Sequence, residues 1–200
     1  MMTEEIERLA SAIDEKEFIP SINQERPRFV QPEDLIRYRA TRIILICGML
    51  NTVNGLSKEV ISCVDFLLRN PAYQRKFILE YFKDQQNLAK KLQKYMPQQS
   101  VEMDFNIVRY KSIPWDLRFN DMFLYLYVRK LVEFKGKKPT LRVQLTEDGK
   151  NYFGAIKEIF VDEVNFLELF GSRIKEEDAT KIITEVIPNS YWKENEKLNY

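Results

Sequence analysis

The chain contains no histidine among its 200 residues. It therefore lacks the Ser-His-Asp and Cys-His catalytic arrangements, histidine-ligated zinc and the usual general base at neutral pH. Only two cysteines occur, and Cys47 and Cys63 each lie inside an apolar helical pattern. We expect both to be buried thiols rather than a disulfide, and two cysteines alone do not form a zinc site.

Glycine is scarce as well. The six glycines are scattered singly, and neither GxGxxG nor GxxxxGK[ST] occurs, so no phosphate-binding loop is expected. The acidic residues show no spacing typical of a two-metal nuclease or a paired-carboxylate site. We predict that the chain is not an enzyme and that it uses no cofactor or metal.

Long apolar runs are also missing. The longest candidate, Ile43 to Leu50, is far shorter than the roughly 20 residues that span a bilayer. The start, MMTEEIERLA, lacks the apolar core of a signal peptide. We expect a cytoplasmic protein without membrane association. With 44% apolar residues, the chain can still bury a core.

Charge is unevenly distributed although the formal net charge is only +1. Residues 104–153 hold ten basic and six acidic residues, a net charge of +4. Residues 69–94 hold seven basic and two acidic residues, a net charge of +5, and both ends of the chain are acidic. A nucleic-acid contact is therefore expected only in the middle of the chain.

Residues 115–153 read as helix, strand, turn, strand and helix. Over residues 116–130 the apolar side chains fall at helical spacing and predict one core-facing stripe: Phe119, Met122, Phe123, Leu126 and Tyr127. Two β-like runs follow, at 131–134 and 141–145, separated by turn residues. A helix that leads into a basic two-stranded hairpin is the layout of a winged helix.

The next helix has a clear start. Thr146 is a favourable N-cap, whereas Gly149 inside that helix predicts a cost of about 1 kcal/mol relative to alanine. We predict a mainly α fold with a small β-hairpin, a winged-helix core and extra helices at both ends.

We divide the chain into three predicted parts. Residues 1–32 form an N-terminal helix and extended arm, which either docks on this chain or a partner or is a frayed terminus. Residues 33–155 form a winged-helix-like core with an inserted basic helix at 72–96. Residues 156–200 form C-terminal helices and a tail. There the aromatic pair Tyr191 and Trp192 is either a partner anchor or is docked on the chain's own core.

Within these parts the pattern predicts further elements. They are a helix over 33–53, a helix capped by Ser57 and ended by Pro71, a strand near 105–108, a helix running from 147 towards 170, and a last helix over 174–186.

Ten basic side chains are the candidates for binding nucleic acid or a partner. They are Arg118, Arg129 and Lys130 on the helix before the hairpin, Lys135, Lys137, Lys138 and Arg142 on the hairpin, and Lys83, Lys90 and Lys91 on the basic helix. In a winged helix the helix enters the major groove while the wing contacts phosphates. Here that helix is aromatic and offers few Asn, Gln or Arg side chains, so base reading is not expected. The basic face of 72–96 is either a solvated surface or a contact for DNA phosphates or an acidic partner.

Two stretches, LSKEVISCVDFLLRNP (Leu56 to Pro71) and WDLRF…LVEF…VQLTEDG (Trp115 to Gly149), carry a resemblance. Together they resemble the middle component of ABC-three-component systems, including the small subunit of Lamassu-type bacterial anti-phage defence. The resemblance covers roughly Tyr38 to Phe153. The helix at 72–96 departs from a minimal winged helix and leaves open which helix is the recognition helix.

The resemblance implies a non-catalytic adaptor. Such subunits bind an SMC-like or Rad50-like ATPase and help to couple the sensing of foreign DNA to a separate effector, commonly a nuclease. The alternative is a free-standing winged-helix transcriptional regulator that binds double-stranded DNA as a dimer with strong salt dependence.

Overall fold

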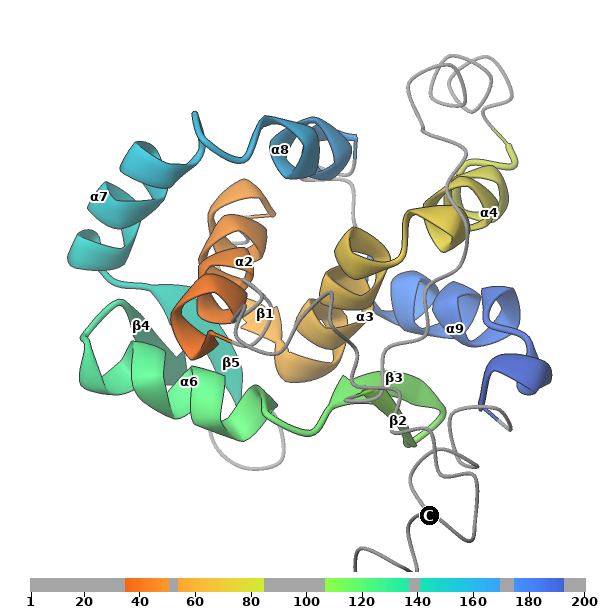
Figure 1. The fold of residues 1–200 in the computed structure, drawn as a ribbon, viewed down its shortest axis with the longest axis horizontal. Helices are drawn as coiled ribbons and strands as arrows, with labels where there is room; N and C mark the ends of the chain where they lie inside the picture. The colour runs from red at the N-terminus through yellow and green to blue at the C-terminus, as the bar shows by residue number, and fades with distance from the viewer. Residues whose placement is uncertain (1–34, 51–53, 85–106, 137–140, 170–174, 193–200) are drawn as a thin grey trace, which may run out of the picture. The chain divides into compact units, whose positions relative to one another are not determined.

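The computed structural model describes residues 35–50, 54–84, 107–136, 141–169 and 175–192. The chain divides into two units, Met1–Gln31 and Pro32–Tyr200, and every described residue belongs to the second. The predicted helix and arm within 1–32 therefore lie outside the described residues. The described part is mainly helical with a small antiparallel sheet, as the sequence predicted (Figure 1).

The elements follow in this order: α2 (Ile36–Met49), β1 (Leu56–Ser57), α3 (Lys58–Arg69), α4 (Pro71–Tyr81), β2 (Ile107–Tyr110), β3 (Ile113–Asp116), α6 (Phe119–Val128), β4 (Val132–Lys135), β5 (Arg142–Leu145), α7 (Glu147–Ile156), α8 (Val161–Glu168) and α9 (Glu176–Val186).

Helix α2 lies at the centre of the core. Its residues Ile43 to Ile46 are fully buried, because helices α3, α6, α7 and α8 pack around it (Figure 1). The run from Ile43 to Cys47 is apolar on every side of the helix, and such a segment is stable only in these surroundings. The predicted helix over 33–53 is confirmed from Ile36 to Met49.

Both boundaries predicted for α3 are confirmed. The Ser57 hydroxyl accepts a hydrogen bond from the Val60 N–H at 3.3 Å and caps the first turn. At the other end Asn70 is the last cap, and Pro71 begins α4, where a proline without an N–H is well tolerated.

Two small antiparallel sheets are present in the described part of the chain. The first has the strand order β1-β5-β4, with Leu56 opposite Val143 and Val132 opposite Leu145. The predicted hairpin is therefore confirmed, and β1, only two residues long, was not predicted. The second sheet is the hairpin β2-β3, with Lys111 and Ser112 at φ of 47° and 69° in its turn.

The β2-β3 hairpin corrects one prediction. We predicted a single strand near 105–108 and a helix that begins at Asp116, but Trp115 and Asp116 belong to β3. The Asp116 side chain is buried, forms ion pairs with Arg39 and Arg69, and accepts the Arg118 N–H at 2.8 Å. These partners hold Asp116 in the strand, and α6 begins only at Phe119.

Two predicted helices are too long. The helix predicted over 72–96 ends at Tyr81, where a turn at Phe82 buries its ring beside that of Tyr81, and residues 85–96 lie outside the described residues. The helix from 147 towards 170 is broken between α7 and α8 at residues 157–160. Helices α7 and α8 both pack on α2. The bend between them allows both contacts, whereas one straight helix would diverge from α2.

The predicted Thr146 cap is confirmed, but the interpretation of Gly149 as a weakness is wrong. The Thr146 hydroxyl accepts the Gly149 N–H at 3.0 Å and donates to the Lys130 carbonyl at 2.5 Å. The Leu131 carbonyl oxygen lies so near Gly149 that a Cβ atom there would collide with it. Glycine lets the chain entering β4 approach α7 closely.

The C-terminal aromatic pair is docked on the chain's own core. Tyr191 and Trp192 are buried, and the Tyr191 ring lies edge-on to Phe66 at 5.7 Å and to Tyr73 at 5.8 Å. The cysteine prediction also holds, because Cys47 and Cys63 are free and buried. Burial raises the pKa of the Cys47 thiol to about 12 and also raises that of Cys63.

Candidate functional site

The structure separates the predicted basic residues. Arg118 precedes the start of α6, and Arg129 and Lys130 follow its end. Lys135 and Arg142 lie opposite each other on β4 and β5, and Lys83 follows α4. The other four candidates, Lys90, Lys91, Lys137 and Lys138, lie outside the described residues.

The two hairpin cations are engaged within the chain. The Arg142 guanidinium forms an ion pair with Glu176 at 2.5 Å and donates to the Gly55 carbonyl at 3.0 Å. Lys135 forms an ion pair with Glu133 at 3.0 Å. Arg142 therefore connects β5 to α9 and to the loop before β1. Because Lys135 and Arg142 already have partners within the chain, they are disfavoured as ligand contacts.

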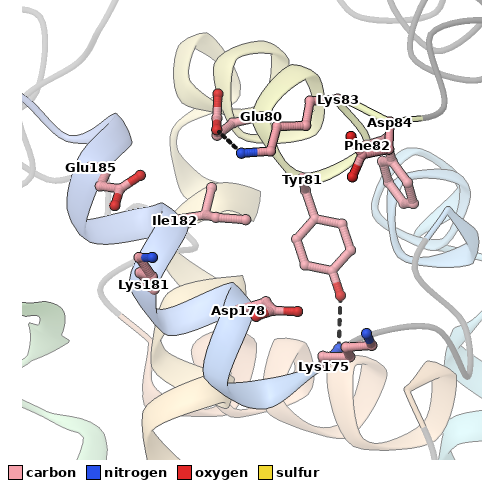
Figure 2. A pocket seen from close by; sticks show the side chains of 10 residues that line it. All are labelled: Glu80, Tyr81, Phe82, Lys83, Asp84, Lys175, Asp178, Lys181, Ile182 and Glu185. Carbon is pink, nitrogen blue, oxygen red and sulfur yellow. Dashed lines mark hydrogen bonds and ion pairs between the residues drawn. The ribbon is translucent and has the colours of Figure 1, made fainter.

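Lys83 lies in a cleft of mixed charge between α4 and α9 (Figure 2). The cleft has a volume of about 600 Å³, and its charged residues are Glu80, Asp84, Asp178, Glu185, Lys83, Lys175 and Lys181. Lys83 bonds Glu80 at 3.1 Å, and the hydrogen bond to that carboxylate raises the lysine pKa. Because the carboxylates offset the lysines, this cleft does not form a cationic surface for phosphates.

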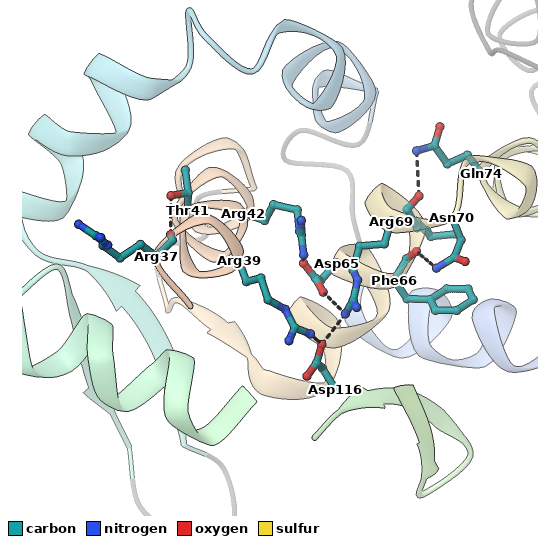
Figure 3. A network of polar contacts seen from close by, with 11 residues as sticks. Arg37, Arg39, Thr41, Arg42, Asp65, Phe66, Arg69, Asn70, Gln74 and Asp116 are labelled. Carbon is teal, nitrogen blue, oxygen red and sulfur yellow. Dashed lines mark hydrogen bonds and ion pairs between the residues drawn. The ribbon is translucent and has the colours of Figure 1, made fainter. Parts of the chain in front are cut away.

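A network of arginines and aspartates lies in the interior (Figure 3). Arg42 donates to Asp65 at 2.8 Å, Arg69 lies between Asp65 and Asp116, and Arg39 also contacts Asp116. These residues connect α2, α3 and β3, so the network is a structural one that fixes the β2-β3 hairpin to the core. We did not predict this network, although its charged residues stand out within apolar helical patterns of the sequence.

Helix α6 has one apolar side in the core and another in solvent. Phe119, Met122, Phe123 and Leu126 are buried, whereas Leu124 is 61% exposed, Tyr127 55% and Val128 69%. We call Leu124, Tyr127 and Val128 the α6 face. The prediction that Tyr127 belongs to the buried stripe is wrong, because its ring lies at the edge of the core beside Phe134. Neighbouring exposed apolar side chains of this kind mark interaction sites.

A smaller cleft lies between α2, α6 and α7, beside the α6 face. Its volume is about 280 Å³, and it is lined by Arg37, Ala40, Thr41, Tyr125, Leu126, Arg129, Leu131 and Tyr152. The Arg129 guanidinium lies over the Tyr125 ring at 5.5 Å. Arg37 points away from the buried arginine–aspartate network (Figure 3). We call this the Arg37–Arg129 cleft. Arg129 is one of the ten candidates predicted from the sequence, whereas Arg37 is not.

No family model, curated protein or solved structure matches this chain. None of the helices in the described part is long and apolar enough to cross a membrane. Among the described residues, no three carboxylate or cysteine side chains gather in a way that would hold a metal ion. The α6 face and the Arg37–Arg129 cleft form the candidate site among the described residues.

Proposed function

We propose that this chain is a non-catalytic winged-helix adaptor that binds a protein partner through the α6 face. Support for the winged helix comes from the chain order α2, β1, α3, α6, β4, β5 and the sheet order β1-β5-β4. That arrangement gives three helices and a three-stranded sheet that ends in a hairpin. Helix α4 and the β2-β3 hairpin then form an insertion before the third helix.

The observation that carries the proposal is the chemistry of the α6 face. In this topology α6 takes the place of the third helix, which reads the major groove in DNA-binding helix-turn-helix proteins. Base edges are read mainly by Arg, Lys, Asn and Gln side chains. The exposed side of α6 instead presents Leu124, Tyr127 and Val128. Apolar and aromatic side chains are the ones that anchor protein interfaces.

The identity of the proposed partner rests on the resemblance. The stretches Leu56 to Pro71 and Trp115 to Gly149 resemble the middle component of ABC-three-component systems. The partner is accordingly an SMC-like or Rad50-like ATPase, and the adaptor couples it to a nuclease or other effector in anti-phage defence. The alternative, a free-standing DNA-binding regulator, is favoured by the cations at the two ends of α6, Arg118 and Lys130.

Two measurements on the full chain separate the alternatives. In the first, the purified chain is titrated with short duplex DNA at two salt concentrations. In the second, it is co-expressed with a candidate SMC-like or Rad50-like ATPase and a candidate effector from the same organism and purified by a tag on the ATPase. The adaptor is expected to bind duplex weakly alone and to co-purify at fixed stoichiometry. Tight, salt-sensitive duplex binding without co-purification would establish the regulator instead.

A further inference from the structure

The α6 face and the Arg37–Arg129 cleft adjoin along one helix. Tyr125 and Arg129 are four residues apart and lie on the flank of α6 that faces α2 and α7. Leu124 and Val128 directly precede them and point to solvent. One extended or helical segment laid across α6 therefore meets apolar side chains and the cleft together.

The cleft carries positive charge that carboxylates within the described residues do not offset. Its lining includes two guanidinium groups, and none of the lining residues is acidic. By contrast, Lys83, Lys135, Arg142 and Lys150 each form an ion pair with a glutamate. The Arg129 guanidinium carbon lies 5.5 Å from the centroid of the Tyr125 ring, at cation–π distance. Guanidinium edges bind carboxylates with two parallel hydrogen bonds.

The size and walls of the cleft restrict what enters it. A volume of about 280 Å³ is at or below the lower end for small-molecule sites, roughly 300 Å³, and suits a protein side chain. Ala40, Leu126 and Leu131 line it together with the rings of Tyr125 and Tyr152. An acidic group at the end of an apolar stem, such as glutamate, satisfies both the walls and the arginines.

Duplex DNA fits this surface less well. A phosphate would satisfy the two arginines, but the adjoining backbone would then lie against Leu124 and Val128. The Leu124 and Val128 side chains would then lie against a charged backbone and not in an apolar environment. Their burial would therefore lack the favourable free energy of the hydrophobic effect.

We infer that the α6 face and the Arg37–Arg129 cleft form one docking surface for a partner protein segment that is both apolar and acidic. The apolar side chains of the segment pack on Leu124, Tyr127 and Val128, and a carboxylate enters the cleft. This inference rests on the proposed adaptor function and adds the chemistry by which the partner is recognised.

The first test uses photo-crosslinking in the full chain co-expressed with the candidate ATPase and effector named above. Tyr152 lines the cleft and is 42% exposed, so it is replaced by p-benzoyl-phenylalanine. The same replacement at Tyr110, 45% exposed on the β2-β3 hairpin, is the matched control. Irradiation is expected to link position 152, and not position 110, to a partner segment that carries Asp or Glu among apolar residues.

Each other outcome is decisive. A complex that forms without a link at position 152, or a link to a segment without carboxylates, overturns the inference and leaves the adaptor function standing. A cross-link to DNA would overturn the proposal of a protein segment and would show that the cleft binds phosphate instead. Absence of any complex overturns the adaptor function, and the inference falls with it.

The second test measures how much the charges of Arg37 and Arg129 contribute to partner binding. The double variant Arg37→Gln and Arg129→Gln is expected to bind the partner at least about tenfold more weakly, with a smaller salt dependence. The control, Lys111→Gln and Lys157→Gln, removes the same charge from exposed positions elsewhere and is expected to bind as the wild type does. Equal weakening of partner binding in both variants would show a nonspecific charge effect and would contradict the binding of a carboxylate in the cleft. Unchanged melting temperatures confirm that both variants are folded.

Discussion

Replacing Gly149 by alanine tests how closely the chain entering β4 approaches α7. Helix propensity alone predicts that the alanine stabilises the protein by about 1 kcal/mol. The structure predicts the opposite sign, because the new Cβ would collide with the Leu131 carbonyl oxygen. That carbonyl accepts the Thr146 N–H at 3.2 Å, and the Thr146 hydroxyl bonds the neighbouring Lys130 carbonyl.

The magnitude follows from the groups that must move. Overpacking against a fixed backbone costs about 1–3 kcal/mol, and a weakened N-cap adds about 1 kcal/mol. After the gain in helix propensity is subtracted, Gly149→Ala should lower the free energy of unfolding by about 1–3 kcal/mol.

The same helix supplies the control. Gly154 is exposed, and no atom lies within 4 Å of a Cβ built on it. Gly154→Ala should therefore raise the free energy of unfolding by about 0.5–1 kcal/mol. Urea unfolding followed by far-ultraviolet circular dichroism measures both variants against the wild type. Stabilisation by both alanines would refute the close approach at Gly149.

The remaining predictions concern the turn after α6, the interior and the C-terminal aromatic pair. Lys130 has a φ of 57° at the end of α6, where the Leu131 N–H donates a hydrogen bond to the Leu126 carbonyl at 2.9 Å. Because glycine adopts this conformation without strain, Lys130→Gly should stabilise the protein by about 1 kcal/mol in urea unfolding, whereas Lys130→Ala should not. Asp116→Ala leaves Arg39 and Arg69 buried without that carboxylate and should cost about 3–5 kcal/mol, seen as a large drop in melting temperature. Cys47 and Cys63 should resist a thiol reagent at pH 8 in the folded protein and react fully in urea, because burial raises both thiol pKa values; rapid labelling of the folded chain would contradict their burial. Burial also raises the Tyr191 pKa from 10.0 to about 12, so its neutral form contributes stability that is fully present below pH 10 and is lost as the pH rises through about 12. Since the Tyr191 hydroxyl is buried without a hydrogen-bond partner among the described residues, Tyr191→Phe should stabilise the protein by about 1 kcal/mol at pH 7 and flatten the alkaline loss; an unchanged alkaline profile would count against this assignment.

Local signals in the sequence predicted the elements that local chemistry determines. Ser57 and Thr146 cap helices because their hydroxyl groups meet the first free N–H groups, and this needs no tertiary contact. The alternation from Leu141 to Leu145 and the break at Pro71 are equally local.

The wrong predictions lie where tertiary contacts, and not the local sequence, determine the structure. Asp116 stays in a strand because Arg39 and Arg69 contact it from other elements. Phe82 leaves the predicted helix to bury its ring. Gly149 is favourable only because Leu131 approaches it. The partners of Asp116 and Gly149 are distant in sequence, so periodicity and propensity do not reveal them.

The candidate site was predicted in part. Arg129 and Lys130 were selected by charge, but Arg37 was missed because it adjoins Arg129 only when α2 and α6 pack together. Tyr127 was assigned to the core by its spacing, although its place is at the edge. A pattern of apolar residues identifies which helix side is buried, but here the helix is apolar on both sides.

The affinity of the full chain for the proposed ATPase partner tests the α6 face most directly. Leu124 and Val128 are each about two-thirds exposed, at 61% and 69%. Covering each of them is worth about 1–2 kcal/mol, since full burial is worth about 1.5–3 kcal/mol.

In isothermal titration calorimetry, the double variant Leu124→Ser and Val128→Ser should bind the proposed ATPase partner roughly 100-fold more weakly than the wild type does, the equivalent of about 3 kcal/mol. The control, Ile159→Ser and Val161→Ser, removes two apolar side chains of similar exposure, 74% and 52%, just before α8 and at its first residue, and should bind as the wild type does. A wild-type affinity in the Leu124 and Val128 variant would contradict docking through α6.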